Sequence, residues 1–267
     1  MTLKNLMVHL SQSHRTPHRL EVAVALARKH DARLVGVFGQ IAAKGGGGTW
    51  PPEDYRHARD ASRAAFQAAT TGLRAAEWVD LDRGTEAQIL RHMVDRARAF
   101  DLVVMGQYSE PGMSFAPPDL CEEVVVNSGR PVLIIPYIGS YVELGRRPLV
   151  AWNNSRESAR ALNDALPVIE GCEEVVVFSA GEKAGGGDPH ADVSAHLAAH
   201  GMKSKSNQVV LDEEIGVMDF LLDRASDLSV DLLVMGANAP EWRPFASHGT
   251  GTRYVLRHMT VPVLMSN

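Results

Sequence analysis

Short apolar runs alternate with amphipathic stretches along the whole chain, and this alternation predicts strands joined by helices. Asp101–Gly106 and the stretch 131–136 are continuous apolar runs of strand length. Such runs are typical of parallel strands that are covered on both faces. Ahead of the first run, Ile89, Met93 and Ala97 recur at helical spacing and define one apolar face. Strands that alternate with helices predict parallel sheets with right-handed crossovers.

The same pattern occurs twice. The motif DLVVMG at Asp101–Gly106 recurs as DLLVMG at Asp231–Gly236, 130 residues later, and the apolar run after Pro131 recurs after Pro262. Two separate segments with nearly equal offsets indicate a domain-sized repeat. We therefore predict an α/β chain of two tandem doubly wound domains, each a five-stranded, mostly parallel sheet with helices on both faces. The expected limits are 1–138 and 148–267, joined by a linker at 139–147.

The pattern also predicts where the elements lie. In the first copy, strands are expected at 6–10, 34–38, 76–81, 101–106 and 131–136. The first helix is expected to be capped by Thr16 with Pro17 in its first position, and Thr85 and Gln88 have the spacing of a capping box. In the second copy, strands are expected at 148–152, 174–179, 208–211, 232–235 and 261–265. Helices are expected there at 155–168, 188–200, 217–228 and 250–258.

Composition narrows the class of protein. The chain has 267 residues, is 45% hydrophobic and 22% charged, and has a net charge of −5. That balance argues against a nucleic-acid-binding protein, which needs a basic face. Cys121 and Cys172 are far apart, which argues against a disulfide scaffold or a zinc ribbon. The N-terminus lacks a signal-peptide pattern and the apolar runs are too short to span a membrane, so we expect a cytoplasmic protein without membrane contact.

One loop carries candidate chemistry. Gly249, Thr250, Gly251 and Thr252 open a predicted helix after the last DLLVMG motif. A helix N-terminus presents unpaired N–H groups and partial positive charge, glycines let an anion approach the backbone, and threonine hydroxyls can donate to it. The alternative is a plain threonine cap after a turn glycine. The loop is not a P-loop, because no lysine follows in the required place.

The sequence resembles the universal stress protein family in its tandem form, whose domains are adenine nucleotide alpha-hydrolase-like. Family members that bind ATP carry G-x2-G-x9-G-[ST] after the fourth strand, and the matching positions are Gly236, Ala239, Gly249 and Thr250. Ala239 stands where the family has its second glycine. The resemblance also implies that Asn153, in place of an acidic residue, holds the ribose, and that the backbone near Ser179 faces the adenine.

The first copy departs further from that motif. Its counterpart positions are Gly106, Ser109, Asp119 and Leu120, and its first strand ends near Ser11. A carboxylate at the position of Asp119 is expected to cap its own helix and to repel a phosphate. We predict that the first copy binds no nucleotide and serves as a structural partner.

Three functions remain open. The first is a stress-response or regulatory module that binds ATP or AMP in the second copy, with Mg²⁺ as a companion of ATP, and with at most weak ATP hydrolysis. The second is a scaffold for dimerisation or interaction, or a binder of another small molecule. The third is an enzyme of the same fold. The family also pairs domains through the edge of the last strand, so we expect the strands at 132–135 and 263–265 to pair within the chain, with a homodimer as a further option. His196 and His200 lie one helical turn apart without a third ligand at motif spacing, and no metal site is expected.

Overall fold

The computed structural model describes residues 2–41, 51–82, 84–108, 115–180, 188–210, 216–237 and 250–267. The chain divides into two compact units, an N-terminal unit that ends at Val142 and a C-terminal unit that runs from Glu143 to Asn267. The boundary between them lies within the predicted linker. Each unit is described by itself below.

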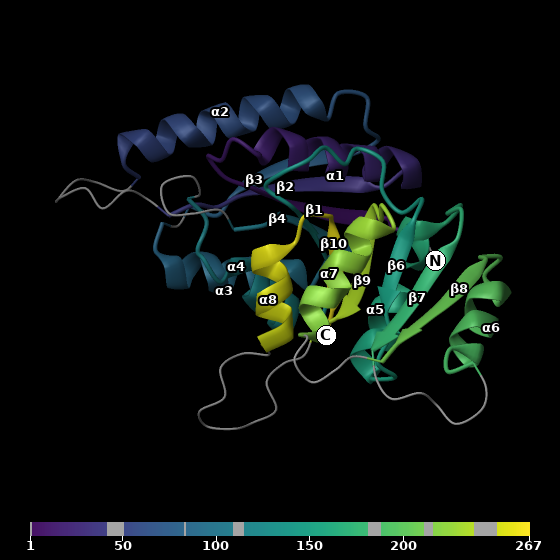
Figure 1. Cartoon of the computed structure of the whole chain (residues 1–267). Helices are drawn as coiled ribbons and strands as arrows, with labels where there is room; N and C mark the ends of the chain where they lie inside the picture. Colours follow the sequence, from purple (N-terminus) through teal and green to yellow (C-terminus); the bar gives the residue numbers. More distant parts are fainter. Residues whose placement is uncertain are drawn as a thin grey trace. The chain divides into compact units, whose positions relative to one another are not determined.

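The N-terminal unit is a parallel five-stranded sheet with helices on both faces (Figure 1). The strand order is β3-β2-β1-β4-β5. Helices α1 and α2 cover one face, and α3 and α4 cover the other. The strands are β1 (Asn5–Leu10), β2 (Arg33–Phe38), β3 (Ala76–Asp80), β4 (Leu102–Gly106) and β5 (Val132–Ile135). The helices are α1 (Thr16–His30), α2 (Glu53–Ala69), α3 (Glu86–Ala97) and α4 (Leu120–Asn127).

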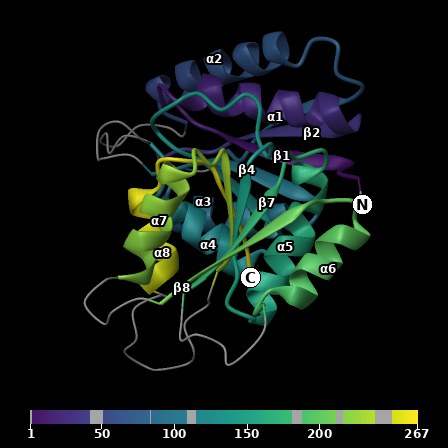
Figure 2. The ribbon, with the colours of Figure 1, turned by 45° about the vertical axis from the view of Figure 1, so that its right-hand side comes forward.

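The C-terminal unit repeats this plan with the order β8-β7-β6-β9-β10, again with parallel neighbours. Helices α5 and α6 lie on one side of this sheet and α7 and α8 on the other (Figure 2). The strands are β6 (Pro148–Ala151), β7 (Val175–Ala180), β8 (Ser204–Val209), β9 (Leu232–Gly236) and β10 (Val263–Ser266). The helices are α5 (Arg156–Ile169), α6 (Ala191–Ala199), α7 (Val217–Asp227) and α8 (Thr250–His258).

These two sheets confirm the predicted fold class. The central strands β4, β5 and β9 are almost completely buried, as continuous apolar runs predict. The largest boundary error is β8, which begins at Ser204 rather than at residue 208. Its sequence SKSNQV is polar because β8 is the outer strand of its unit, so hydrophobicity does not mark its start.

Helix starts differ from the sequence prediction at several helices. Thr16 is the first residue of α1 rather than its cap, and its hydroxyl donates to the carbonyl of Ser11 at 2.7 Å. Asp119 occupies the cap position of α4, but its side chain makes no capping hydrogen bond, so that prediction is wrong in detail. The predicted capping box of Thr85 and Gln88 does not form at α3, because the Thr85 hydroxyl donates to Oε1 of Gln88 at 2.8 Å and makes no capping hydrogen bond. A reciprocal capping box occurs instead at α5, between Ser155 and Ser158.

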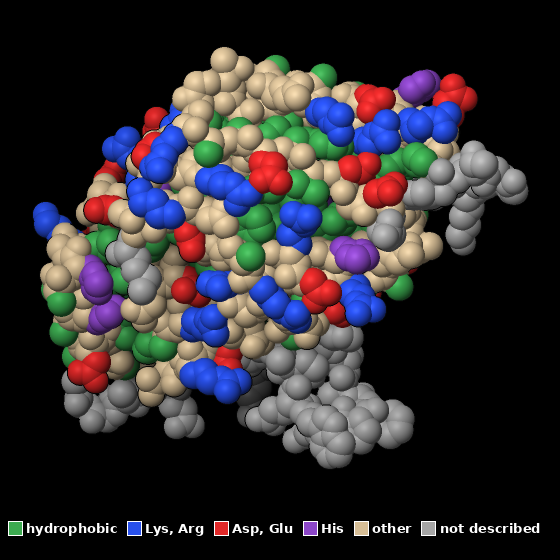
Figure 3. All heavy atoms as spheres, turned by 180° about the vertical axis from the view of Figure 1, so that it is seen from behind, with side chains coloured by type: hydrophobic (Ala, Val, Ile, Leu, Met, Phe, Trp, Pro, Cys, Tyr) green, Lys and Arg blue, Asp and Glu red, His purple; other side chains and the backbone are tan. Residues whose placement is uncertain are grey.

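Surface chemistry agrees with a protein of mixed charge. On the face shown in Figure 3, acidic side chains lie among the basic ones over the described residues. Among the described helices, none is both long and apolar enough to cross a bilayer.

Candidate functional site

A cavity of ≈ 340 Å³ opens at the carboxyl ends of the strands in the C-terminal unit. It lies beyond β6 and β9, where the strand order reverses, which is where ligands bind in open α/β sheets. Helix α7 and the first turn of α8 form the remaining wall. Its volume is within the range of about 300–1,000 Å³ that small-molecule sites occupy. The described lining is Ala151, Trp152, Asn153, Phe178, Ser179, Ala180, Val217, Met218, Leu221, Met235, Gly236, Gly251 and Thr252.

Five of the eight predicted site residues line this cavity. They come from three strand ends and one helix start, and they are Asn153, Ser179, Gly236, Gly251 and Thr252. Thr250 is the first residue of α8. Ala239 and Gly249 lie outside the described residues. Residues as far apart in sequence as Asn153 and Thr252 therefore meet at one place.

The start of α8 provides hydrogen-bond donors. Its first turn contains no acidic residue, so the partial positive charge of the helix N-terminus is not neutralised from within. Thr252 is only 4% exposed and lines the cavity. A Cβ atom added at Gly251 would meet only the flexible end of Met218, with Cε at 3.2 Å. This helix start can therefore receive an anionic group, and a small side chain at Gly251 is sterically tolerable.

Gly236 has a packing role. A Cβ atom at Gly236 would lie 2.6 Å from the carbonyl carbon of Glu157 and from the amide nitrogen of Ser158. The end of β9 thus lies against the backbone of the first turn of α5, and only glycine allows this contact. The glycine of the DLLVMG motif is explained by this packing, with or without a ligand.

Asn153 is exposed and lies two residues after the end of β6. Its side-chain Oδ1 accepts a hydrogen bond from the backbone N–H of Ser155 at 3.2 Å. The oxygen is thus held by the turn that leads into α5. The amide NH₂ group is the part of this side chain suited to donate to a ribose oxygen.

The side chain of Ser179 belongs to a different cluster. Phe178 stacks on Phe220 of α7, on the side of the cavity, with ring centroids 6.0 Å apart. Because side chains alternate along a strand, Ser179 points to the opposite face. There its Oγ lies 2.8 Å from Nε2 of His190. The side chain of Ser179 is therefore turned away from the cavity that this residue lines.

His190 links three segments on that opposite face. Its Nδ1 lies 2.7 Å from Oγ of Ser206, which donates to Oδ1 of Asp188 at 2.9 Å. Since Ser206 uses its proton on Asp188, Nδ1–H of His190 donates to Ser206, and Ser179 donates to Nε2. Burial lowers the pKa of His190, so this neutral form is the stable one. The arrangement differs from a hydrolytic triad, because Ser206 stands between His190 and the carboxylate of Asp188, and Ser179 Oγ is turned away from the cavity.

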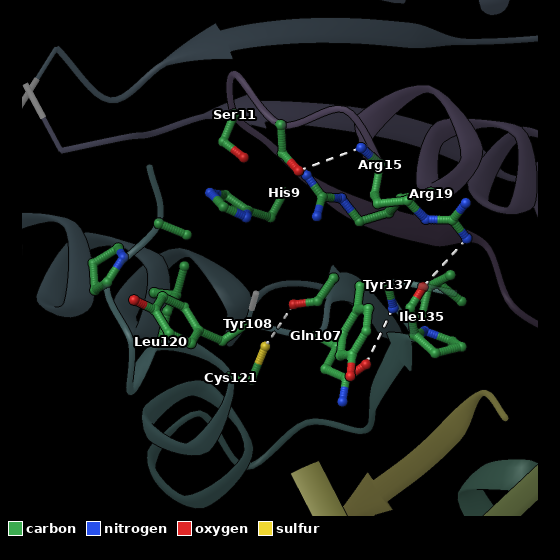
Figure 4. A pocket seen from close by; sticks show the side chains of 15 residues that line it. His9, Ser11, Arg15, Arg19, Gln107, Tyr108, Leu120, Cys121, Ile135 and Tyr137 are labelled. Atoms are coloured by element: carbon green, nitrogen blue, oxygen red, sulfur yellow. Dashed lines mark hydrogen bonds between the residues drawn. The ribbon is translucent and has the colours of Figure 1, made fainter. Parts of the chain in front are cut away.

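The N-terminal unit has a counterpart cavity of only ≈ 20 Å³ (Figure 4). Val8 pairs with Val104, and Val150 pairs with Val234 at the same place in the repeated motif. His9 therefore corresponds to Ala151. The larger side chain of His9 lines the small cavity, whereas Ala151 lines the large one.

Two further replacements separate the copies. Helices α4 and α8 begin at equivalent positions, so Cys121 and Glu122 stand where Gly251 and Thr252 stand in the second copy. Glu122 and Glu123 bring negative charge to the first turn of α4, which disfavours a phosphate. Arg19 of α1 also enters this cavity, close enough to Gly106 that a Cβ atom there would lie 2.1 Å from its Nη1.

Sequence reasoning missed Arg19 and His9, although both carried a signal. Arg19 lies on the helical face that also presents Ala23, Leu26 and His30, all buried. His9 lies within the otherwise apolar strand β1 and is 2% exposed. A polar side chain on an apolar stripe indicates a buried polar group. The cluster of Ser179, His190 and Ser206 carried no comparable signal, because it joins residues from three segments.

Comparison with known proteins supports the fold. No protein-family model matches the sequence, and no curated protein sequence matches it significantly. A crystal structure of a universal stress protein from Archaeoglobus fulgidus is similar over 98% of this chain and 96% of its own, with a TM-score of 0.70 and 17% identity. A functionally unknown protein from Pseudomonas aeruginosa is similar over 99% of this chain and 92% of its own, with a TM-score of 0.61 and 14% identity. Both likenesses extend over the two units, so the chain has the fold of a tandem universal stress protein, as its sequence motifs predict.

Proposed function

We propose that the C-terminal unit binds an adenine nucleotide, ATP or AMP, and that the N-terminal unit does not. The observation that carries this proposal is the ≈ 340 Å³ cavity, in which the start of α8 and the residues after β6 meet at the reversal of strand order. The equivalent cavity of the N-terminal unit, at ≈ 20 Å³, has no room for a nucleotide.

The cavity has an apolar part and a donor part. Phe178, Met218 and Leu221 line the apolar part, which suits a purine ring. Gly251 and Thr252 at the start of α8 supply N–H and hydroxyl donors for phosphate oxygens. The Asn153 amide is assigned to the ribose. Gly249, Thr250 and Ala239 are expected to complete the phosphate loop.

The described lining holds no carboxylate, imidazole or amine. We therefore assign binding with at most weak hydrolysis, since the described wall offers no general base and no carboxylate ligand for a metal ion. In an ATP complex, Mg²⁺ would be held mainly by the phosphates. A bound nucleotide without rapid turnover suits a cytoplasmic stress-response or regulatory module, and the predicted pairing of β5 with β10 would join its two units.

Calorimetric titration of the purified chain with ATP and with AMP tests the proposal. We expect one nucleotide bound per chain. Absence of heat with either ligand up to 1 mM, which corresponds to about −4.1 kcal/mol, would leave the scaffold function in its place. Release of phosphate faster than once per minute, abolished by a cavity substitution, would favour the enzyme instead.

A further inference from the structure

The C-terminal unit has a second cavity, at the amino ends of its strands. Its volume is ≈ 380 Å³, within the range of about 300–1,000 Å³ that small-molecule sites occupy. In its lining, Arg147 and Glu174 directly precede β6 and β7, and Arg224 and Leu228 lie at the end of α7. The candidate nucleotide cavity lies at the other ends of the strands, and the two cavities share no described lining residue.

The strand register shows which face of the sheet borders this cavity. Val176 and Phe178 point to the same side of β7, and Phe178 stacks on a phenylalanine of α7. In the parallel register, Lys205 is the partner of Val176 and Asn207 is the partner of Phe178, so these side chains share that side of the sheet. Lys205 and Val176 therefore lie next to each other on the face that α7 covers.

Arg224 of α7 brings a guanidinium group to the same face. The side-chain oxygen of Asn207 accepts hydrogen bonds from Nε and Nη2 of Arg224 at 3.1 and 3.2 Å. These bonds hold one edge of the guanidinium, while Nη1 has no hydrogen-bond partner among the described residues. The free end, formed by Nη1 and the second N–H of Nη2, matches the two oxygens of a carboxylate.

The lining has more cations than available carboxylates. Lys205 and Arg147 join Arg224, and within the described part of the chain none of the three has a carboxylate within the 4.0 Å of an ion pair. Of the two carboxylates in the lining, Glu173 is paired with Arg146 at 3.2 Å, and Glu174 is exposed. The charge of the lining therefore favours an anionic ligand.

The lining also has an apolar part, formed by Val176, Leu228 and Val230. An apolar surface beside cations suits an anion with a hydrocarbon body better than an inorganic ion. We propose that this cavity binds a small organic acid, with its carboxylate on Arg224 and Lys205 and its hydrocarbon body against these three side chains. This inference is independent of nucleotide binding at the other cavity.

Calorimetric titration of the wild-type chain with sodium benzoate tests the site, because benzoate carries both a carboxylate and an apolar ring. We expect saturable binding of one benzoate per chain. Benzamide has nearly the same shape without the charge, and acetate has the charge without the ring, so each should bind at least about tenfold more weakly. Equal affinities for benzoate and benzamide would overturn the proposal, as would the absence of benzoate binding at roughly 10 mM.

Two substitutions and a matched control identify the binding groups. Arg224→Met and Lys205→Met should each weaken benzoate binding by about tenfold. Lys203→Met, which removes an exposed lysine directly before β8 and outside the described lining, should leave the affinity unchanged. Wild-type affinity in both Arg224→Met and Lys205→Met would show that these cations do not hold the carboxylate.

Amide chemical shifts of the ¹⁵N-labelled wild-type chain locate the ligand without any substitution, and so keep the proposal testable if the variants do not fold. Benzoate should shift the amide resonances of Val176, Lys205 and Arg224. Shifts confined to Asn153 and Thr252 would place benzoate in the nucleotide cavity and would refute the second site.

Discussion

The buried His9 makes the stability of the N-terminal unit depend on pH. Its ring is 2% exposed, and Nε2 donates to the carbonyl of Gly39 at 2.7 Å. Burial, and secondarily the charge of Arg19, lower the pKa of His9 from 6.5 to about 3. The folded state therefore binds this proton far more weakly than the unfolded state does. The stabilising effect is fully present above pH 6.5 and is lost as the pH falls towards about 3.

The size of the effect follows from proton linkage. Between pH 6.5 and about 3 the unfolded state carries one extra proton, which lowers the free energy of unfolding by about 1.4 kcal/mol per pH unit. Integrated from pH 7 to pH 5, with an unfolded pKa of 6.5, the loss due to His9 is about 2 kcal/mol. Carboxylates and His190 titrate as well, so only a difference between variants isolates the His9 contribution.

Urea unfolding at pH 7 and pH 5 provides that difference. Gln in place of His9 offers a donor to Gly39 and does not titrate, so His9→Gln should lose about 2 kcal/mol less than the wild type between these pH values. His14→Gln serves as the control, because His14 is exposed in the same unit. A wild-type pH dependence retained in full by His9→Gln would show that His9 is not held neutral by burial.

Three other substitutions test the C-terminal unit. Gly236→Ala should lower the free energy of urea unfolding by about 2 kcal/mol or more, since its Cβ would clash with the α5 backbone, while Gly251→Ala should be neutral or stabilising. Gly251→Asp should abolish nucleotide binding in calorimetry by repelling phosphate, whereas Ala191→Asp, which adds the same charge at the exposed first position of α6, should not. His190→Ala should cost about 1–3 kcal/mol in urea unfolding, because it leaves two hydroxyl groups without their partner; a cost below 0.5 kcal/mol would contradict the assigned network.

The sequence predicts the fold well because the repeat and the apolar runs are strong signals. The central strands β4 and β9 carry the same motif and are buried in both units. The polar outer strand β8 is predicted poorly, because its residues are not selected by burial. Helix periodicity places Arg19 on a buried stripe but does not reveal what surrounds it.

The candidate site is only partly predictable for a physical reason. The glycine and threonine spacing identifies the start of α8, since local backbone geometry governs that choice. The difference in cavity volume depends on Ala151 in the C-terminal unit and His9 in the N-terminal unit. These two positions can be recognised as equivalent only when the strand registers are known. The structure also shows a packing requirement at Gly236 that the spacing of glycines alone does not reveal.

Amide hydrogen exchange with and without ATP tests most directly whether the C-terminal unit binds nucleotide and the N-terminal unit does not. If only the C-terminal unit binds nucleotide, exchange slows in the first turn of α8 and near Asn153 and does not change in α4 of the N-terminal unit. Slower exchange at α4, or equal exchange throughout the chain at saturating ATP, would contradict it.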